Sequence, residues 1–183
     1  MVPWFLATEP FGPADGERWS KYIEWSGLTQ LTELVTLDSL LCPPILKHIR
    51  DEYWPHIANE DYMLAYFTDL EFLKKQVAGQ KKMNLLCVVR NPISPMAAPE
   101  SGFEFVGYDL VEPESGVSAL TNCGGFPDVF TNSELSKYGL LTDFDRAAQV
   151  KTKLRSLYPD EHHAHCDLWA TFRAGIPQAS ALA

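Results

Sequence analysis

Residues 103–122 read FEFVGYDLVEPESGVSALTN, and this stretch decides which fold we expect. Aromatic and β-branched residues fill both of its ends, and the residues PESG at 113–116 are typical of a turn. We therefore expect two strands joined by a tight connection. The first arm is apolar on both faces, as in a strand that is covered on both sides. Gly107 interrupts this arm and predicts a β-bulge or a close backbone approach.

Asp109 lies in the middle of the apolar first arm. Burying a carboxylate without a partner is costly, so this residue either faces solvent or is hydrogen-bonded inside the protein. A structural role of that kind is the commoner one for such an aspartate. The alternative is that Asp109 belongs to a functional site.

The remaining elements predict an α+β fold. Residues 83–90 are apolar at nearly every position, as in a buried strand, and residues 164–173 alternate as a strand does. Amphipathic patterns predict helices over 69–78 and 142–158. Because several strands follow one another without a helical crossover, we expect an antiparallel or mixed β-sheet with helices packed mainly on one face.

We expect the 183 residues to form a single α+β domain. Residues 1–30 contain several Pro and Gly residues and follow neither a helical nor a strand period. They are either an integral part of the sheet or an irregular N-terminal arm.

Charge and cysteine content limit the partners and the location. The net charge of −9 argues against nucleic acid as the main partner, because Lys and Arg carry affinity for phosphates. It suits a basic protein partner, although many proteins are acidic for solubility alone. The four Cys residues are far apart in apolar stretches and are expected to be reduced. No signal peptide or membrane-spanning stretch is recognised, so we expect a cytoplasmic protein without membrane contact.

An acidic and aromatic stretch between residues 51 and 62 is the best candidate for a contact surface. Tyr and Trp provide a large contact area at low entropic cost, and carboxylates between them can bind Lys and Arg of a partner. The alternative is that Trp54 and Tyr62 are core residues with solvated acidic neighbours. The predicted partner-binding residues are Asp51, Glu52, Tyr53, Trp54, Glu60, Asp61 and Tyr62.

The sequence EHHAHCD at 161–167 is the densest group of metal-ligating residue types. If the last strand begins at about His163, then His163, His165 and Asp167 share one face, as a metal site would require. Zinc is the metal such a site would take, and otherwise no cofactor is expected. The alternative is that these histidines are solvated or packed at a junction between a loop and a strand.

Cys123 is followed by Gly124 and Gly125, which leaves room for free backbone N–H groups around a thiol. A nucleophilic cysteine needs a base, and the fold could bring a histidine from 163–165 to it. The alternative is a structural thiol beside a glycine bend. The phosphate-binding, dinucleotide-binding, nucleophile-elbow and HExxH zinc motifs are all absent from the sequence.

In size, α+β class, acidic charge, aromatic content and lack of a catalytic motif, the chain resembles the small bacterial immunity proteins of polymorphic or contact-dependent toxin systems. The resemblance is one of type across the whole chain, including NEDYMLAYFTDLEFL and SALTNCGGFPDVF, and no functional residues carry over from it. It implies an immunity-type inhibitor that occludes a toxin, here a basic one. The alternatives are a small hydrolase or metal-dependent enzyme that uses the cluster at His163 and His165, and a sensor with a ligand pocket under residues 92–102.

Overall fold

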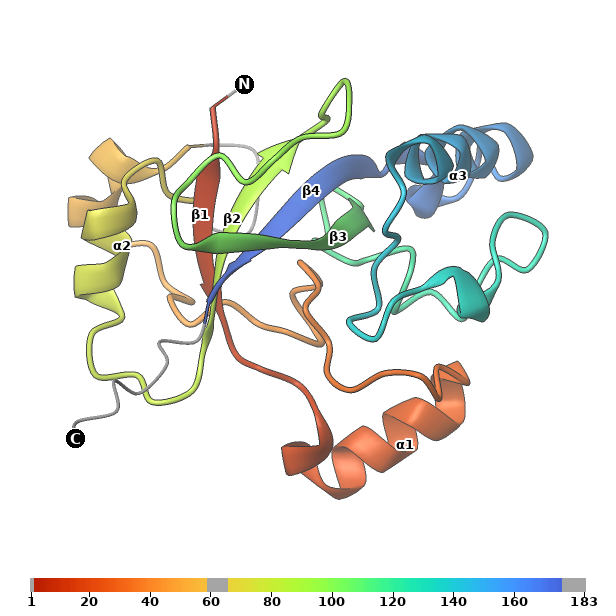
Figure 1. The fold of residues 1–183 in the computed structure, drawn as a ribbon, viewed down its shortest axis with the longest axis horizontal. Helices are drawn as coiled ribbons and strands as arrows, with labels where there is room; N and C mark the ends of the chain where they lie inside the picture. The colour runs from red at the N-terminus through yellow and green to blue at the C-terminus, as the bar shows by residue number, and fades with distance from the viewer. Residues whose placement is uncertain (1, 59–65, 176–183) are drawn as a thin grey trace.

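Four strands form one antiparallel sheet in the computed structural model, which describes residues 2–58 and 66–175 (Figure 1). Each neighbouring pair of strands is antiparallel. The predicted α+β class is confirmed. The strands lie in the order β1 (Trp4–Thr8), β2 (Asn84–Arg90), β4 (Asp167–Ala174) and β3 (Phe103–Val111).

The first arm of the predicted hairpin is a strand, but its partner is not the second arm. β3 pairs along its length with β4, and residues 117–122 contribute a single bridge between Val111 and Ser118. The predicted second strand is therefore wrong. The physical reason is that Ser118 and Asn122 donate hydrogen bonds to buried carboxylates, which bends this segment out of a strand.

Gly107 forms the β-bulge that the sequence indicates. The register between β3 and β4 shifts between Phe105 and Gly107. The glycine has φ of 147°, and a Cβ atom on it would lie 2.5 Å from the Leu140 Cβ. A larger residue cannot occupy this position without moving the segment that crosses β3, so the glycine is needed for a close backbone approach.

Three α-helices and four short 3₁₀ helices complete the described fold. α2 packs beside the edge strand β1, and α3 packs against β3 and β4 (Figure 1). Among the described helices, none combines the length and the apolar character needed to cross a membrane. The helices are α1 (Glu17–Ser26), α2 (Leu70–Gln76) and α3 (Phe144–Leu157), and the 3₁₀ helices are η1 (Pro13–Asp15), η2 (Asp51–His56), η3 (Asn132–Glu134) and η4 (His162–His165).

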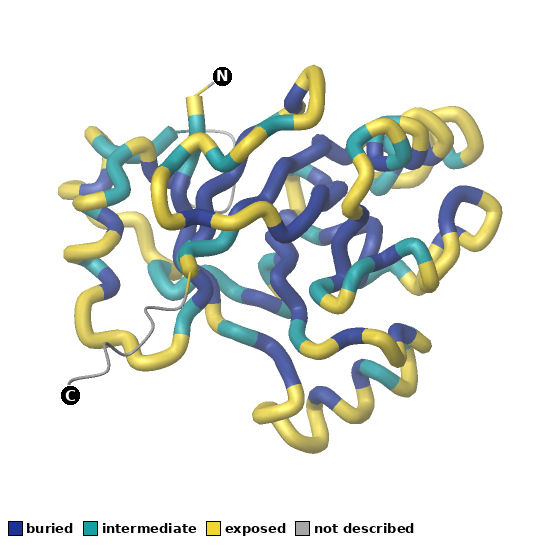
Figure 2. The backbone as a smooth tube through the Cα atoms, viewed as in Figure 1, coloured by how far each residue is buried: buried dark blue, intermediate teal, exposed yellow. Residues whose placement is uncertain are grey.

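The two faces of the sheet are covered in different ways. One face belongs to the larger hydrophobic cluster, to which all three α-helices contribute, for example through Trp19, Leu73 and Val150. The other face, around Trp169, is covered by residues outside these helices, including Leu140. Buried backbone is concentrated in the sheet and exposed backbone in the loops and on the outer sides of the helices (Figure 2). The helices thus cover mainly one face, as expected.

The N-terminal thirty residues are integral to the fold. β1 pairs with β2 from Trp4 to Thr8, and α1 buries Trp19 and Tyr22. The irregular arm that the sequence left open is therefore wrong for the described part of this segment. The prolines and glycines that obscured the pattern lie between β1 and α1, where they form turns.

Candidate functional site

Two buried carboxylates lie beneath the loop that carries Cys123. Asp109 is fully buried in β3, and its two oxygens accept hydrogen bonds from the hydroxyls of Thr36 and Ser118, both at 2.6 Å. The backbone N–H groups of Leu37 and Leu110 also donate to it. Burial raises the pKa of Asp109, and the donors act in the opposite direction. The structural reading of Asp109, paired inside the protein, is the one that its contacts support.

Asp38 is equally buried and joins the same network. It accepts from the backbone N–H groups of Leu40 and Leu41, which lie in its own turn. It also accepts from the Ser118 N–H at 2.8 Å and from the Asn122 side chain at 3.0 Å. These bonds fix the loop at 118–123 against the segment at 36–41, which is about 80 positions away in the sequence.

Cys123 and His163 meet above this network. The Cys123 Sγ lies 3.1 Å from the His163 Nδ1, although the two residues are 40 positions apart. His163 comes from η4, and its ring packs edge-on against Phe126. The structure thus brings together the cysteine and one of the histidines that the sequence singled out. A thiol and an imidazole at this distance can exchange a proton.

The surroundings of Cys123 keep its sulfur protonated. Burial raises the pKa of the Cys123 thiol to about 12, and the carboxylates of Asp38, Asp109 and Glu112 add to this effect. A reactive cysteine usually has the opposite environment, with cations or a helix N-terminus nearby. Cys123 therefore differs from a preformed thiolate, and its proton would have to leave during a reaction.

The backbone after Cys123 is open to an incoming group. Gly124 and Gly125 have φ of 72° and 87° and are exposed. Within the described chain, the N–H groups of residues 123–125 donate to no protein acceptor. The hollow on this side of the loop holds only about 10 Å³, which is too small for a substrate. Any ligand of Cys123 would therefore lie on the surface.

The arrangement on which the metal prediction depended is wrong. β4 begins at Asp167 and not near His163, so both histidines lie in η4 and share no strand face with Asp167. The Asp167 carboxylate accepts from Arg90 and Asn91, each at 2.7 Å, and His165 is exposed. Residues 2–58 and 66–175 contain no group of three or more His, Cys, Asp or Glu residues placed to hold a metal ion.

The four cysteines are free, as a reduced protein would have them. Cys42, Cys87 and Cys166 are buried, whereas Cys123 is half-buried. Cys123 is therefore the most accessible of the four thiols.

The predicted contact surface is divided by the fold. Tyr53 is 2% exposed and packs against Phe67 and Phe72, so its predicted role in direct partner binding is wrong. The neighbouring Trp54 is 53% exposed. In a 3₁₀ helix two successive side chains point in different directions, so one aromatic ring faces the core and the next faces solvent. Asp51 and Glu52 are exposed, and Glu60, Asp61 and Tyr62 lie outside the described residues.

Sequence reasoning missed Thr36, Asp38 and Ser118 as members of the polar network. A signal for them is the occurrence of short polar residues inside otherwise apolar runs, in LVTLDSLL and VSALTN. Such residues have to find partners when the run is buried, and a buried Asp109 needs donors from elsewhere in the chain.

Comparison of the chain with protein-family models, with curated proteins and with solved structures finds no match. Any functional assignment therefore depends on the geometry and chemistry of the residues themselves.

Proposed function

We propose that the chain is a protein-binding module that docks a basic partner through the surface formed by Ile49, Asp51, Glu52 and Trp54. The observation that carries this proposal is the exposure of Trp54, at 53%, in a helix that the buried Tyr53 anchors. Ile49 is also exposed, at 41%. An anchored tryptophan binds at low entropic cost, which is why such residues dominate many interfaces.

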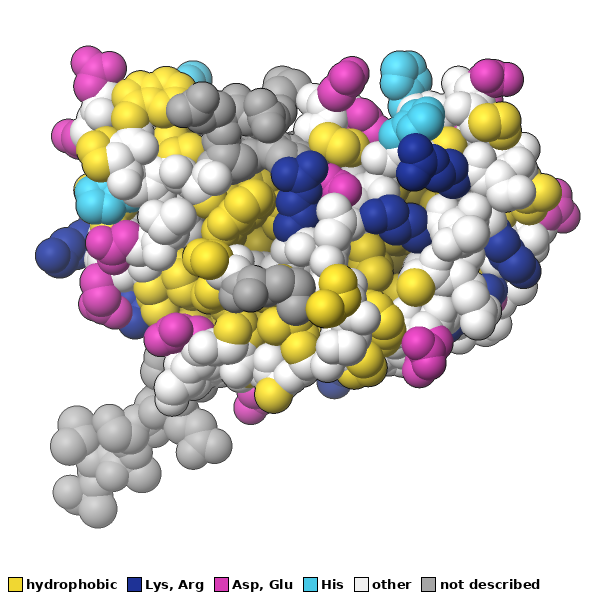
Figure 3. All heavy atoms as spheres, turned by 90° about the horizontal axis from the view of Figure 1, so that it is seen from above, with side chains coloured by type: hydrophobic (Ala, Val, Ile, Leu, Met, Phe, Trp, Pro, Cys, Tyr) yellow, Lys and Arg dark blue, Asp and Glu magenta, His cyan; other side chains and the backbone are white. Residues whose placement is uncertain are grey.

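The charges around Trp54 indicate which partner chemistry fits. Asp51 and Glu52 are exposed, and Asp51 has no ion-pair partner among the described residues. Glu52 reaches Arg50 only at 3.6 Å in an exposed pair, which is weak and easily replaced. On the side of the molecule where η2 lies, hydrophobic side chains are bordered by acidic ones (Figure 3). A Lys or Arg of a partner can contact both the carboxylates and the indole ring.

The finer proposal is an immunity-type inhibitor in a bacterial cytoplasm, which would occlude a basic toxin or enzyme. The net charge of −9 supports it, because opposite charge accelerates the encounter of an inhibitor with a basic target. The resemblance of type to bacterial immunity proteins supports it as well. The four free thiols fit a reducing compartment.

Native mass spectrometry of complexes purified from the cells that make this protein tests the proposal. We expect a basic partner at one-to-one stoichiometry, and we expect Trp54→Ala or Asp51→Lys with Glu52→Lys to reduce its recovery by at least about tenfold. Trp25→Ala is the matched control, because Trp25 is 56% exposed on α1, away from η2. Equal recovery with the Trp54 and Trp25 variants would exclude this surface.

A second candidate function, a small hydrolase, is favoured by the contact between Cys123 and His163. In such an enzyme the Cys123 Sγ would attack a carbonyl carbon while His163 takes the thiol proton and passes it to the leaving group. Water would then hydrolyse the thioester and regenerate the thiol. The N–H groups of Gly124 and Gly125 would stabilise the oxyanion. The raised thiol pKa and the small hollow place this candidate second.

Acylation by p-nitrophenyl acetate, followed by mass spectrometry of the modified residue, tests the hydrolase candidate. If His163 acts as the base, His163→Ala lowers the acylation rate of Cys123 by about tenfold or more, within the usual range for general-base catalysis. His165→Ala serves as the control, because His165 is exposed in the same helix η4. An unchanged rate in the His163 variant would leave Cys123 as a structural thiol.

A further inference from the structure

A cavity of about 660 Å³ lies at the end of the sheet where β1 and β4 end and β2 and β3 begin (Figure 1). This volume is within the range of small-molecule sites. Ser101 and Gly102, which end the loop after β2, also line the cavity, so a hollow lies at one end of the loop where the sequence suggested a ligand pocket. Its walls include Lys81, Lys82, Met83, Asn84, Phe103 and Arg173.

Asn84 is the unusual residue of this cavity. It is 1% exposed, yet neither the oxygen nor the nitrogen of its side-chain amide has a hydrogen-bond partner in the described part of the protein. Thr8 pairs with Asn84 across β1 and β2, and its buried hydroxyl also lacks a partner there. Unsatisfied buried polar groups cost about 1–3 kcal/mol each. A donor and an acceptor are thus held ready at the cavity, at the expense of stability.

The opposite strand leaves the amide uncovered. In the register of β2 and β4, Leu86 pairs with Arg173, and continuing it by two residues places Gly175 opposite Asn84. Glycine has no side chain that could cover or hydrogen-bond the amide. Gly175 itself lines the cavity, so the space opposite Asn84 belongs to this hollow.

Two uncompensated lysines lie at the same cavity. Lys74 pairs with Glu71, and Arg173 pairs with Glu33, so these two cations are already neutralised. Lys81 and Lys82 are exposed and form no ion pair with any described residue. Two adjacent free cations in a protein of net charge −9 favour an anion at this place.

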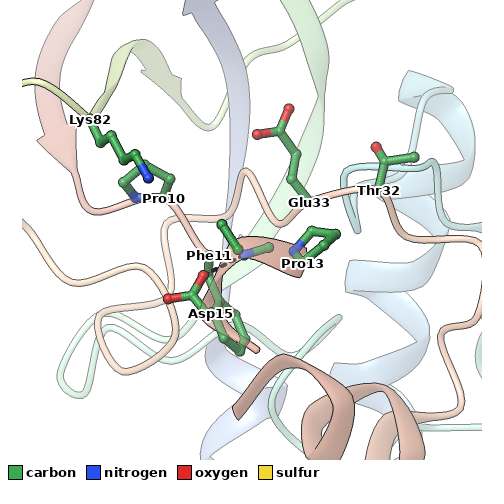
Figure 4. A pocket seen from close by; sticks show the side chains of 9 residues that line it. Pro10, Phe11, Pro13, Asp15, Thr32, Glu33 and Lys82 are labelled. Carbon is green, nitrogen blue, oxygen red and sulfur yellow. Dashed lines mark hydrogen bonds between the residues drawn. The ribbon is translucent and has the colours of Figure 1, made fainter. Parts of the chain in front are cut away.

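The adjoining hollow does not supply that anion. It holds about 360 Å³ and shares Pro10 and Lys82 with the cavity (Figure 4). Its two carboxylates are those of Asp15 and Glu33. Asp15 accepts from the Gly12 N–H, and Glu33 is paired with Arg173, so both already have partners.

From these observations we infer that the cavity binds a small organic anion built as a nucleoside monophosphate is, with an anionic group joined to a planar ring that carries a donor and an acceptor. The Asn84 amide matches the donor and acceptor edge of such a ring, as asparagine does with adenine. Lys81 and Lys82 contact the anionic group, while Met83 and Phe103 contact the ring. This inference goes beyond the proposed protein-binding function and does not depend on it.

Calorimetric titration with AMP, GMP, CMP and UMP tests the inference on the full chain. We expect saturable binding of at least one nucleotide with a Kd below about 1 mM. Lys81→Glu with Lys82→Glu weakens this binding by at least about tenfold, and Lys153→Glu, an exposed lysine on α3, leaves it unchanged. Adenosine and inorganic phosphate, titrated separately, show whether both parts of the ligand are needed. Absence of binding by all four nucleotides overturns the inference.

Asn84→Leu separates a ligand-binding role from a structural one. Leucine is close to asparagine in size and removes two unsatisfied groups, so we expect a thermal midpoint a few degrees higher together with loss of nucleotide binding. A lower midpoint, or binding equal to that of the unmodified protein, contradicts the role of Asn84. The double lysine variant retains its value as a test even if Asn84→Leu folds poorly.

Discussion

Buried polar groups are treated in opposite ways in two regions of this molecule. Around Cys123, each oxygen of Asp38 and Asp109 accepts at least two hydrogen bonds. At the other region, which comprises the two sheet residues Asn84 and Thr171, the buried side-chain polar atoms have no partner in the described chain. The first region costs little to bury and fixes the surrounding loops, whereas the second reduces stability.

The difference separates architecture from function. A network in which every member is satisfied explains itself, because it orders two distant segments of the chain. An unsatisfied amide beside a cavity has no such explanation within the protein, and a ligand that would satisfy it supplies one. Three substitutions can break or sharpen this comparison.

The largest effect is expected for Asp109→Ala. The substitution leaves the hydroxyls of Thr36 and Ser118 without their buried acceptor, and we expect the free energy of unfolding to fall by about 3–5 kcal/mol. Urea denaturation measures it. Asp160→Ala, at an exposed position after α3, is the control and should change stability by less than about 0.5 kcal/mol. A loss below about 1 kcal/mol for Asp109→Ala would mean that the network contributes little to stability.

A smaller effect is expected for Ser118→Ala. This change removes one donor to Asp109 and the acceptor of the Leu120 N–H but keeps the backbone bond to Asp38. Hydrogen bonds to charged groups contribute about 1.5–3 kcal/mol, so we expect a loss in that range in the same urea measurement. Ser156→Ala on the exposed side of α3 controls for the substitution itself. An unchanged stability would place the satisfaction of Asp109 on its other donors.

The smallest effect, and the opposite sign, is expected for Thr171→Val. The Thr171 hydroxyl is fully buried and unpartnered in the described structure, so its removal should raise the free energy of unfolding by about 1 kcal/mol. Thr36→Val is the matched comparison, because Thr36 is equally buried but donates to Asp109, and it should lose about 2 kcal/mol. If both variants shift in the same direction, the two regions do not differ as described.

The contact surface and the thiol site show how far sequence reasoning reaches. Tyr53 and Trp54 are adjacent aromatic residues, and nothing in their types tells which one is buried. Only the packing of Tyr53 against Phe67 and Phe72 decides it. The pairing of Cys123 with His163 was one open alternative, since the sequence contains both groups but not the 3.1 Å between them.

What the sequence determined by itself is local. The apolar period predicted β2, β3 and the helices α2 and α3, and Gly107 predicted a bulge, because these features depend on neighbouring residues. The tertiary structure alone decided that β3 pairs with β4, that Asp38 binds a loop about 80 positions away, and that Asn84 is left without a partner. Such pairings depend on competition among distant segments for burial and hydrogen bonds, and no local pattern records the outcome.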